Sequence, residues 1–171
     1  MRLFIAIRLS DEMKKQLVHL MHNLRKSGTS GNFAHVQNLH LTLCFIGETT
    51  EAEKIKRIME EIRFRPFRLS LSGMGRFGDL LWAGADGGKE LYALADQIRA
   101  KLQAQGIRTD GKEFHPHITL LRRMTGTDGT AFPAPSSKMK VREIFLMRSD
   151  RIHGRMVYTS IYSVSASQDK I

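Results

Sequence analysis

Three stretches of the chain place apolar residues three and four positions apart, which is the pattern of a helix with one buried face. The first covers residues 11–26 and stops before Gly28, a residue type that commonly ends helices. The second starts at Thr50, which forms a capping-box pattern with Glu53, and the third ends at Gly106. The pattern therefore predicts three amphipathic helices, each with one face in a core.

Strands are predicted where β-branched and aromatic residues cluster, or where apolar and polar residues alternate. The segments with these patterns are residues 2–8, 40–46, 67–71, 80–83, 117–121, 139–148 and 155–165. Residues 124–137 are rich in Gly, Pro, Ser and Thr and are predicted to form a loop. The run from Gly73 to Gly78 matches a dinucleotide-binding fingerprint, but a strand rather than a helix follows it, so a glycine-rich hairpin turn is predicted.

Two segments of the chain have the same order of features. Each contains a strand, an amphipathic helix, a stop glycine and a second strand that opens with His-x-Thr-Leu. The histidine follows the glycine by 12 positions in the first segment and by 11 in the second. We interpret this as an internal duplication, although strand–helix–strand units are common enough for coincidence. The duplication predicts an α+β fold of two pseudo-symmetric lobes whose His strands face each other.

The paired motifs are His40-Leu41-Thr42-Leu43 and His117-Ile118-Thr119-Leu120. Side chains two positions apart in a strand share a face, so each strand presents an imidazole and a hydroxyl while its apolar residues point the other way. Two imidazoles can act as general acid and general base, because the ordinary histidine pKa lies near neutral pH. Hydroxyl groups can donate hydrogen bonds to phosphate oxygens. This set of groups suits the opening of a cyclic phosphodiester without a covalent intermediate.

Composition indicates what kind of partner the protein binds and what kind of compartment it occupies. Lys and Arg number 27 against 17 Asp and Glu in 171 residues, so the formal net charge of +10 favours a polyanionic partner. Generic surface charge would give the same count. Cys44 is the only cysteine, which excludes an internal disulfide and is typical of a reducing compartment. The start of the chain resembles a strand rather than a signal peptide, and no apolar run is long enough for a membrane span, so we expect a cytoplasmic location.

The motifs and their flanking residues are similar to those of a known family. The segments that carry the similarity are Arg2–Ile7, Asn38–Glu48 and Phe114–Arg122. The two H-x-T-L motifs resemble the signature of the 2H phosphoesterase superfamily. Their flanks resemble the bacterial and archaeal RNA 2′,3′-cyclic phosphodiesterases, which are also called 2′–5′ RNA ligases. The resemblance runs from the first strand to the last, and its specific part is the pair of motifs with their flanks.

This resemblance implies one bilobal domain over residues 1–171, with antiparallel sheets, helices outside and the active site in a central groove. It implies hydrolysis of an RNA-terminal 2′,3′-cyclic phosphate to a 2′-phosphate, and the reverse joining of RNA ends in some members. In the family pattern His40 protonates the leaving 3′ oxygen and His117 activates water. We expect no cofactor and no metal, a monomer away from membranes, and RNA ends such as those of tRNA fragments as substrate.

The phosphate contacts follow from the motifs and from the resemblance together. Thr42 and Thr119 are expected to bind the phosphate oxygens, and by resemblance Arg122 grips the phosphate with its guanidinium fork. Strict alternation would place Arg122 on the face opposite His117, so the strand must end or bulge before it. By the same alternation, we expect Cys44 on the histidine face.

Two aromatic residues are expected in the core rather than against a base. Alternation places Phe45 on the face opposite His40, and Trp82 belongs to a short apolar strand.

Two other functions stay open on the residues alone. A zinc- or manganese-dependent phosphohydrolase would use His40, His115 and His117, and its activity would be lost on chelation. A non-catalytic RNA- or nucleotide-binding module would bind without turnover, although both motif histidines are present. The residues do not assign the acid and base roles, because the two motifs offer the same groups.

Overall fold

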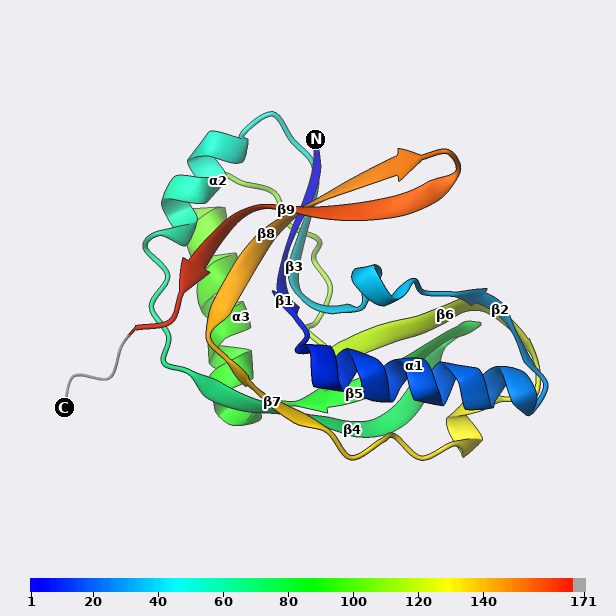
Figure 1. Ribbon diagram of the computed structural model, residues 1–171. Coiled ribbons are helices and arrows are strands. Elements are labelled where there is room, and N and C mark those ends of the chain that lie inside the picture. Colours follow the sequence, from blue (N-terminus) through cyan, green and yellow to red (C-terminus); the bar gives the residue numbers. More distant parts are fainter. Residues whose placement is uncertain (168–171) are drawn as a thin grey trace.

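The computed structural model describes residues 1–167, which form two antiparallel sheets and three α-helices (Figure 1). The domain was expected to cover residues 1–171, and its last four positions, 168–171, lie outside the described residues. Within the described part, no helix is both long enough and apolar enough to cross a membrane.

Each sheet is built from strands of both halves of the chain. Sheet A has the strand order β3 (His40–Glu48), β1 (Arg2–Arg8), β8 (Glu143–Ile152) and β9 (Arg155–Ser165). Sheet B has the order β2 (Thr29–Phe33), β6 (His117–Gly126), β5 (Leu80–Asp86), β4 (Phe67–Phe77) and β7 (Lys138–Val141). The two His-x-Thr strands, β3 and β6, lie in different sheets and contact each other where the sheets meet.

The helices begin and end close to where the apolar spacing predicts. They are α1 (Asp11–Lys26), α2 (Ala52–Met59) and α3 (Gly88–Ala104). The Ser10 hydroxyl caps α1 by accepting a hydrogen bond from the Met13 N–H at 3.2 Å. The predicted capping box of α2 is wrong. Glu51 rather than Thr50 is its N-cap and makes no side-chain cap bond, and the Glu51 N–H donates to the Thr49 hydroxyl.

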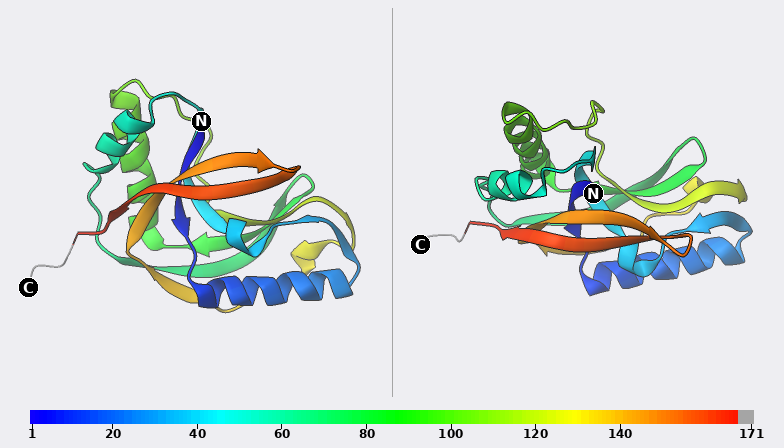
Figure 2. Two further views of the ribbon diagram at one scale, coloured as in Figure 1. Left: turned by 45° about the horizontal axis from the view of Figure 1, so that its top comes forward. Right: turned by 90° about the horizontal axis from the view of Figure 1, so that it is seen from above.

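Each long helix follows a strand of one sheet and packs against the other sheet. Helix α1 leaves β1 of sheet A and packs along sheet B, whereas α3 leaves β5 of sheet B and packs against β3 of sheet A. Figures 1 and 2 show α1 at one end of the molecule and α2 with α3 at the other. This exchange relates β1–α1–β3 to β5–α3–β6 and confirms the predicted fold of two pseudo-symmetric α+β lobes with outer helices.

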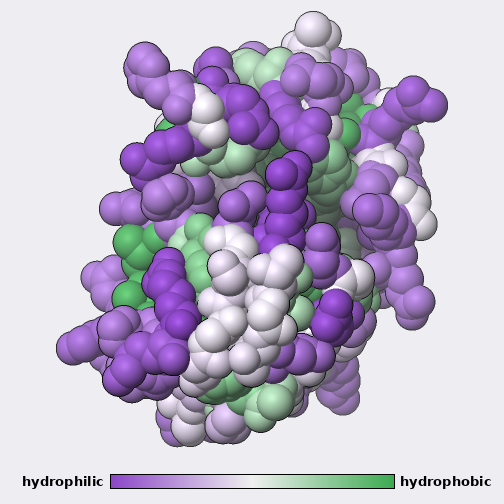
Figure 3. All heavy atoms as spheres, turned by 90° about the vertical axis from the view of Figure 1, so that its right-hand side faces the viewer, coloured by the Kyte–Doolittle hydropathy of each residue, from purple (hydrophilic) through white to green (hydrophobic). Residues whose placement is uncertain are grey.

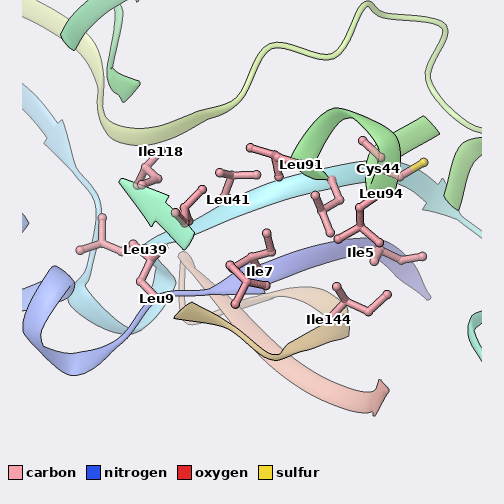
Figure 4. Packing of buried hydrophobic residues seen from close by; sticks show 14 of the residues in the cluster. Ile5, Ile7, Leu9, Leu39, Leu41, Cys44, Leu91, Leu94, Ile118 and Ile144 are labelled. Carbon is pink, nitrogen blue, oxygen red and sulfur yellow. The ribbon is translucent and has the colours of Figure 1, made fainter. Parts of the chain in front are cut away.

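One hydrophobic cluster fills the space between the sheets and the helices. It contains residues of both His strands, and Figure 4 shows Leu41 of β3 and Ile118 of β6 together with Leu91 and Leu94 of α3. Leu41 and Ile118 are fully buried, and each directly follows a motif histidine. The core therefore fixes the inner faces of the two strands that carry the histidines.

The predicted strand over residues 139–148 is two strands in two sheets. β7 pairs with β4 in sheet B, and β8 pairs with β1 in sheet A, with Arg142 between them. The apolar pattern runs through this junction because Val141 and Ile144 are both buried in the shared core. The segment is divided because its two parts pair with strands of different sheets, and the local pattern does not encode these pairing partners. A hairpin joins β4 to β5 as predicted, but its turn lies at residues 78–79, and the run from Gly73 to Phe77 forms the end of β4 rather than the turn.

Truncating either inner anchor of the His strands is expected to destabilise the whole fold. Leu41→Ala and Ile118→Ala each remove a fully buried side chain, and such changes typically cost about 2–5 kcal/mol of unfolding free energy. Urea denaturation measures the loss. Val18→Ala on α1 is the control, because Val18 is 41% exposed and should change stability by less than about 0.5 kcal/mol. An equally small effect at Leu41 or Ile118 would contradict the role of these residues in the core.

Candidate active site

The two histidines and the two threonines lie together on the open faces of β3 and β6. His40, Thr42, His117 and Thr119 are all half-buried, whereas the residues between them point into the core. With the right-hand side of Figure 1 facing the viewer, hydrophobic atoms lie recessed between strongly hydrophilic side chains (Figure 3). We call the region between these open faces the groove.

A backbone carbonyl fixes each imidazole in the same way. The Nδ1 atom of His40 lies 2.7 Å from the carbonyl oxygen of Asn38, and Nδ1 of His117 lies 2.5 Å from that of His115. Since a carbonyl only accepts hydrogen bonds, Nδ1 must carry the proton in both rings. Nε2 is therefore the atom left to exchange protons in each histidine. Nε2 of His40 is 2.8 Å from the Thr42 hydroxyl.

The segments before the two histidines hold these carbonyls in place. The Asn38 amide donates to the Met156 carbonyl of β9 at 2.8 Å and thereby ties the short 3-10 helix Val36–Asn38 to sheet A. Before His117, Pro116 restricts the backbone, and its carbonyl accepts a hydrogen bond from Ala85 of β5. Each imidazole is thus oriented by backbone that is anchored to a neighbouring strand.

A β-bulge follows the motif in each His strand. In the pairing of β3 with β1, Leu43 has no partner residue. In the pairing of β6 with β5, Leu120 has none. Two consecutive residues are consequently buried in each strand, Leu43 with Cys44 in β3 and Leu120 with Leu121 in β6. A bulge inserts one extra residue and reverses the alternation beyond it. The residue five positions after each histidine therefore returns to the groove face.

In β6 this residue is Arg122, so the expected bulge before Arg122 is confirmed. The Arg122 side chain is exposed, and its charge acts on both His40 and His117. Strand β2 approaches closely at this point, because a Cβ on Gly31 would lie 2.7 Å from the Arg122 carbonyl oxygen. The structure thus places all five sequence-predicted site residues around one groove.

In β3 the bulge overturns two expectations. Cys44 does not share the His40 face but is 2% exposed in the core, where burial raises the pKa of its thiol to about 11. Phe45 turns to the groove face instead of the core and packs with Phe4 and Met147. The Arg2 guanidinium lies 4.9 Å from the centre of the Phe45 ring.

Aromatic rings flank both histidines, and the sequence analysis missed most of them. The rings of Phe4 and Tyr158 lie 4.9 and 5.2 Å from that of His40. The rings of Phe77 and Trp82 lie 5.2 and 6.1 Å from that of His117. The expectation that Trp82 belongs to the core is wrong, because it is half-buried and packs on the His117 side of sheet B.

Pairing across strands was the signal that could have located these aromatic residues. Trp82 is the direct partner of Thr119, and paired residues share a face of a sheet.

Both motif histidines have a lowered pKa. For His40, burial is the largest cause, the Asn38 carbonyl opposes it, and the nearby His117 and Arg122 lower the pKa further. For His117, burial is again the largest cause, the His115 carbonyl opposes it, and the His115 ring and Arg122 add to the lowering. In the free protein, burial and the Arg122 charge thus favour the neutral form of both rings.

Among residues 1–167, no group of three or more His, Cys, Asp or Glu side chains is arranged to hold a metal ion. The ring centroids of His115 and His117 lie 6.0 Å apart. His115 contributes its backbone carbonyl to His117 and its ring to the aromatic contacts.

Comparison with protein families matches residues 11–153 to the 2′-5′ RNA ligase superfamily. Among curated proteins, the RNA 2′,3′-cyclic phosphodiesterase of Archaeoglobus fulgidus is 38% identical over 131 residues, which cover 71% of this chain and 72% of that protein. The RNA 2′,3′-cyclic phosphodiesterase of Escherichia coli is 32% identical over 167 residues, which cover 94% and 93% of the two chains.

Solved structures give the same relationship. The apo form of Escherichia coli LigT superposes with a TM-score of 0.84 at 31% identity, covering 98% of each chain. The complex of the same protein with 3′-AMP superposes with a TM-score of 0.82, again at 31% identity and 98% coverage of each chain. The likeness therefore extends over both lobes and the groove between them.

Removing the charge of Arg122 is expected to raise the pKa of both histidines. Arg122→Gln deletes a cationic charge that disfavours the protonated imidazoles, whereas Arg122→Lys keeps the charge and serves as the control. Titration of the ring signals by NMR measures both values in each variant. Histidine signals that titrate identically in wild type and Arg122→Gln would show that the guanidinium does not reach the groove.

Proposed function

This chain belongs to the 2′–5′ RNA ligase superfamily, and we propose that it is an RNA 2′,3′-cyclic phosphodiesterase whose acid and base are His40 and His117. The observation that carries the residue assignment is the matched orientation of the two imidazoles. Both have Nδ1 held by a carbonyl, and both belong to strands that meet at one groove. A hydrolase of phosphodiester bonds with two such groups needs no further catalytic side chain for proton transfer.

The reaction begins with a water molecule on the His117 side of the phosphate. Nε2 of His117 takes a proton as the water oxygen bonds to phosphorus. The bond between phosphorus and the ribose 3′ oxygen then breaks, and this oxygen takes a proton from Nε2 of His40. The product carries a 2′-phosphate and a free 3′-hydroxyl. The family pattern assigns His40 as the donor and His117 as the acceptor, because their surroundings alone are alike.

A bound phosphate favours protonation of His40. Its negative charge beside His40 favours the imidazolium, so it counteracts the lowering of the His40 pKa by burial. Thr42 and Thr119 donate hydrogen bonds to the non-bridging oxygens, and the Arg122 fork pairs with the same oxygens as charge develops. In this scheme the Thr42 hydroxyl leaves Nε2 of His40 when the substrate enters.

The proposed partner is RNA with a 2′,3′-cyclic phosphate end, with tRNA fragments among the candidates. The net charge of +10 supports a polyanionic substrate. We further propose that the protein acts in the cytoplasm as a monomer without a cofactor. The buried free cysteine supports a reducing location.

Loss of either motif histidine is expected to abolish turnover. His40→Ala and His117→Ala should each reduce hydrolysis of a short RNA ending in a 2′,3′-cyclic phosphate by about 100-fold or more, as for other general acids and bases. The assay contains excess chelator, and the product is typed as 2′- or 3′-phosphate. His22→Ala is the control, because His22 is exposed on α1.

The same assay separates the competing functions. A folded wild type that turns over only after metal is added would be a metallohydrolase. A wild type that binds RNA without turnover under either condition would be a binding module.

The motif threonines are expected to act on kcat. Thr119→Val keeps the shape of the side chain and deletes the hydroxyl, so kcat should fall by about 100-fold, the scale of one lost donor to the developing negative charge. Steady-state kinetics on the cyclic-phosphate RNA give this value. Thr159→Val in β9 is the matched control, since Thr159 is exposed and alternates with Tyr158, which faces the groove. Equal rates for the two variants would remove Thr119 from the proposed site.

A further inference from the structure

A pocket of about 360 Å³ lies where the end of β1 and the start of α1 meet the passage from β7 to β8. Figures 1 and 2 show that α1 begins beside this passage. We call it the basic pocket, because cationic side chains outnumber carboxylates in its wall. The charged residues that line it are Arg8, Lys14, Lys140 and Arg142, with Asp11 and Glu143.

The four cations of the basic pocket have no anionic partner within residues 1–167. None of their side chains forms an ion pair or a hydrogen bond there, although two carboxylates line the same pocket. Elsewhere in the chain cations are paired with aspartates, as at Arg76, Arg99 and Arg148. A pocket with a positive excess and unpaired cations attracts an anionic group from solution, and a phosphate has the matching charge.

Arg8 connects the basic pocket to the proposed active site. It is the direct partner of His40 in the pairing of β1 with β3, and paired residues share a face of the sheet with Cα atoms about 4.5–5.5 Å apart. The Arg8 guanidinium lies 5.4 Å from the centre of the Phe145 ring, which also lines the pocket. This cation–π contact holds the charge of Arg8 in the pocket, on the same face of sheet A as His40.

The proposed reaction determines which part of an RNA end lies near this cation. Because His40 protonates the 3′ oxygen, the ribose of the terminal nucleotide lies beside the His40 ring. The 5′ oxygen of that ribose carries the phosphate that joins it to the preceding nucleotide. On the face of sheet A, the neighbours of His40 are the aromatic rings of Phe4 and Tyr158 and the cation of Arg8. Of these, only Arg8 can pair with a phosphate.

We propose that the basic pocket is a binding subsite for the phosphate on the 5′ side of the terminal nucleotide, and that it makes the enzyme select RNA ends over free nucleoside 2′,3′-cyclic phosphates. The assignment rests on the proposed function, because it uses His40 as the proton donor to the 3′ oxygen. A cyclic mononucleotide has the same reacting groups but leaves the pocket empty. The upstream phosphate takes no part in bond making or breaking, so its binding lowers KM rather than raising kcat.

The test compares two substrates that differ by one upstream nucleotide. These are adenylyl-(3′–5′)-adenosine 2′,3′-cyclic phosphate and adenosine 2′,3′-cyclic phosphate. The dinucleotide should have the higher kcat/KM, through a lower KM. Its log kcat/KM should fall more steeply with log salt concentration, by a slope difference of about 0.7, as for one neutralised phosphate of a single strand. A dinucleotide with an uncharged methylphosphonate linkage keeps both bases and should lose both advantages.

Variants of the basic pocket locate the effect. Arg8→Gln and Arg142→Gln should each reduce the preference for the dinucleotide by about 5-fold, the scale of one exposed charge pair, and should bring the two salt slopes together. Arg8→Lys keeps the charge and should keep most of the preference. Arg57→Gln is the matched control, because Arg57 is an exposed cation on α2 that does not line the pocket, and it should leave the preference unchanged.

The remaining outcomes contradict the subsite. Equal kcat/KM values and salt slopes for the two substrates would rule it out while the proposed function stands. So would a preference that persists in the methylphosphonate or in both pocket variants, a preference lost in Arg57→Gln, or turnover of longer RNA alone. A preference lost in Arg151→Gln instead would place the upstream phosphate on the β8–β9 hairpin. A wild type inactive on both substrates and on cyclic-phosphate RNA would rule out the proposed function and the subsite with it.

Discussion

The groove depends on the way β3 and β6 divide their two faces between a shared core and the solvent. Leu41 and Ile118 anchor the strands from inside, and this fixes the opposite face on which the histidines stand. The carbonyls of Asn38 and His115 then hold each ring by Nδ1. The position of each histidine is thus set by apolar packing in the shared core, and its orientation by one backbone hydrogen bond.

The two lobes repeat this design and differ where the bulge returns the chain to the groove. The equivalent positions hold Phe45 in one lobe and Arg122 in the other. An aromatic ring and a guanidinium group in matching places make the groove chemically unequal. Arg122 places a cationic group at one end, which we propose binds the phosphate, and Phe45 packs against Phe4 at the other. The pseudo-symmetry thus supplies two imidazoles in matching positions, and the residues five positions beyond them differ in charge.

Local patterns in the sequence were enough to predict the helices, the motif strands, the fold class and the two histidines and two threonines, whereas Arg122 was predicted from the family resemblance. They failed where the result depends on the partner strand. Cys44 and Phe45 exchanged faces because a bulge is set by pairing with β1, and the need for the matching bulge before Arg122 was seen only because its role demanded it. Trp82 was wrongly predicted to lie in the core, because the apolar character of a strand residue does not show which face of the sheet is buried.

The exchange of α1 and α3 between the lobes governs how the molecule can move. Each sheet is covered by a helix that follows a strand of the other sheet. Neither half therefore has a complete core by itself. Separating the lobes would expose the sheet faces that the exchanged helices cover, so we expect the two halves to unfold together. The spacing of the two imidazoles is therefore set by the same packing that holds the folded chain together.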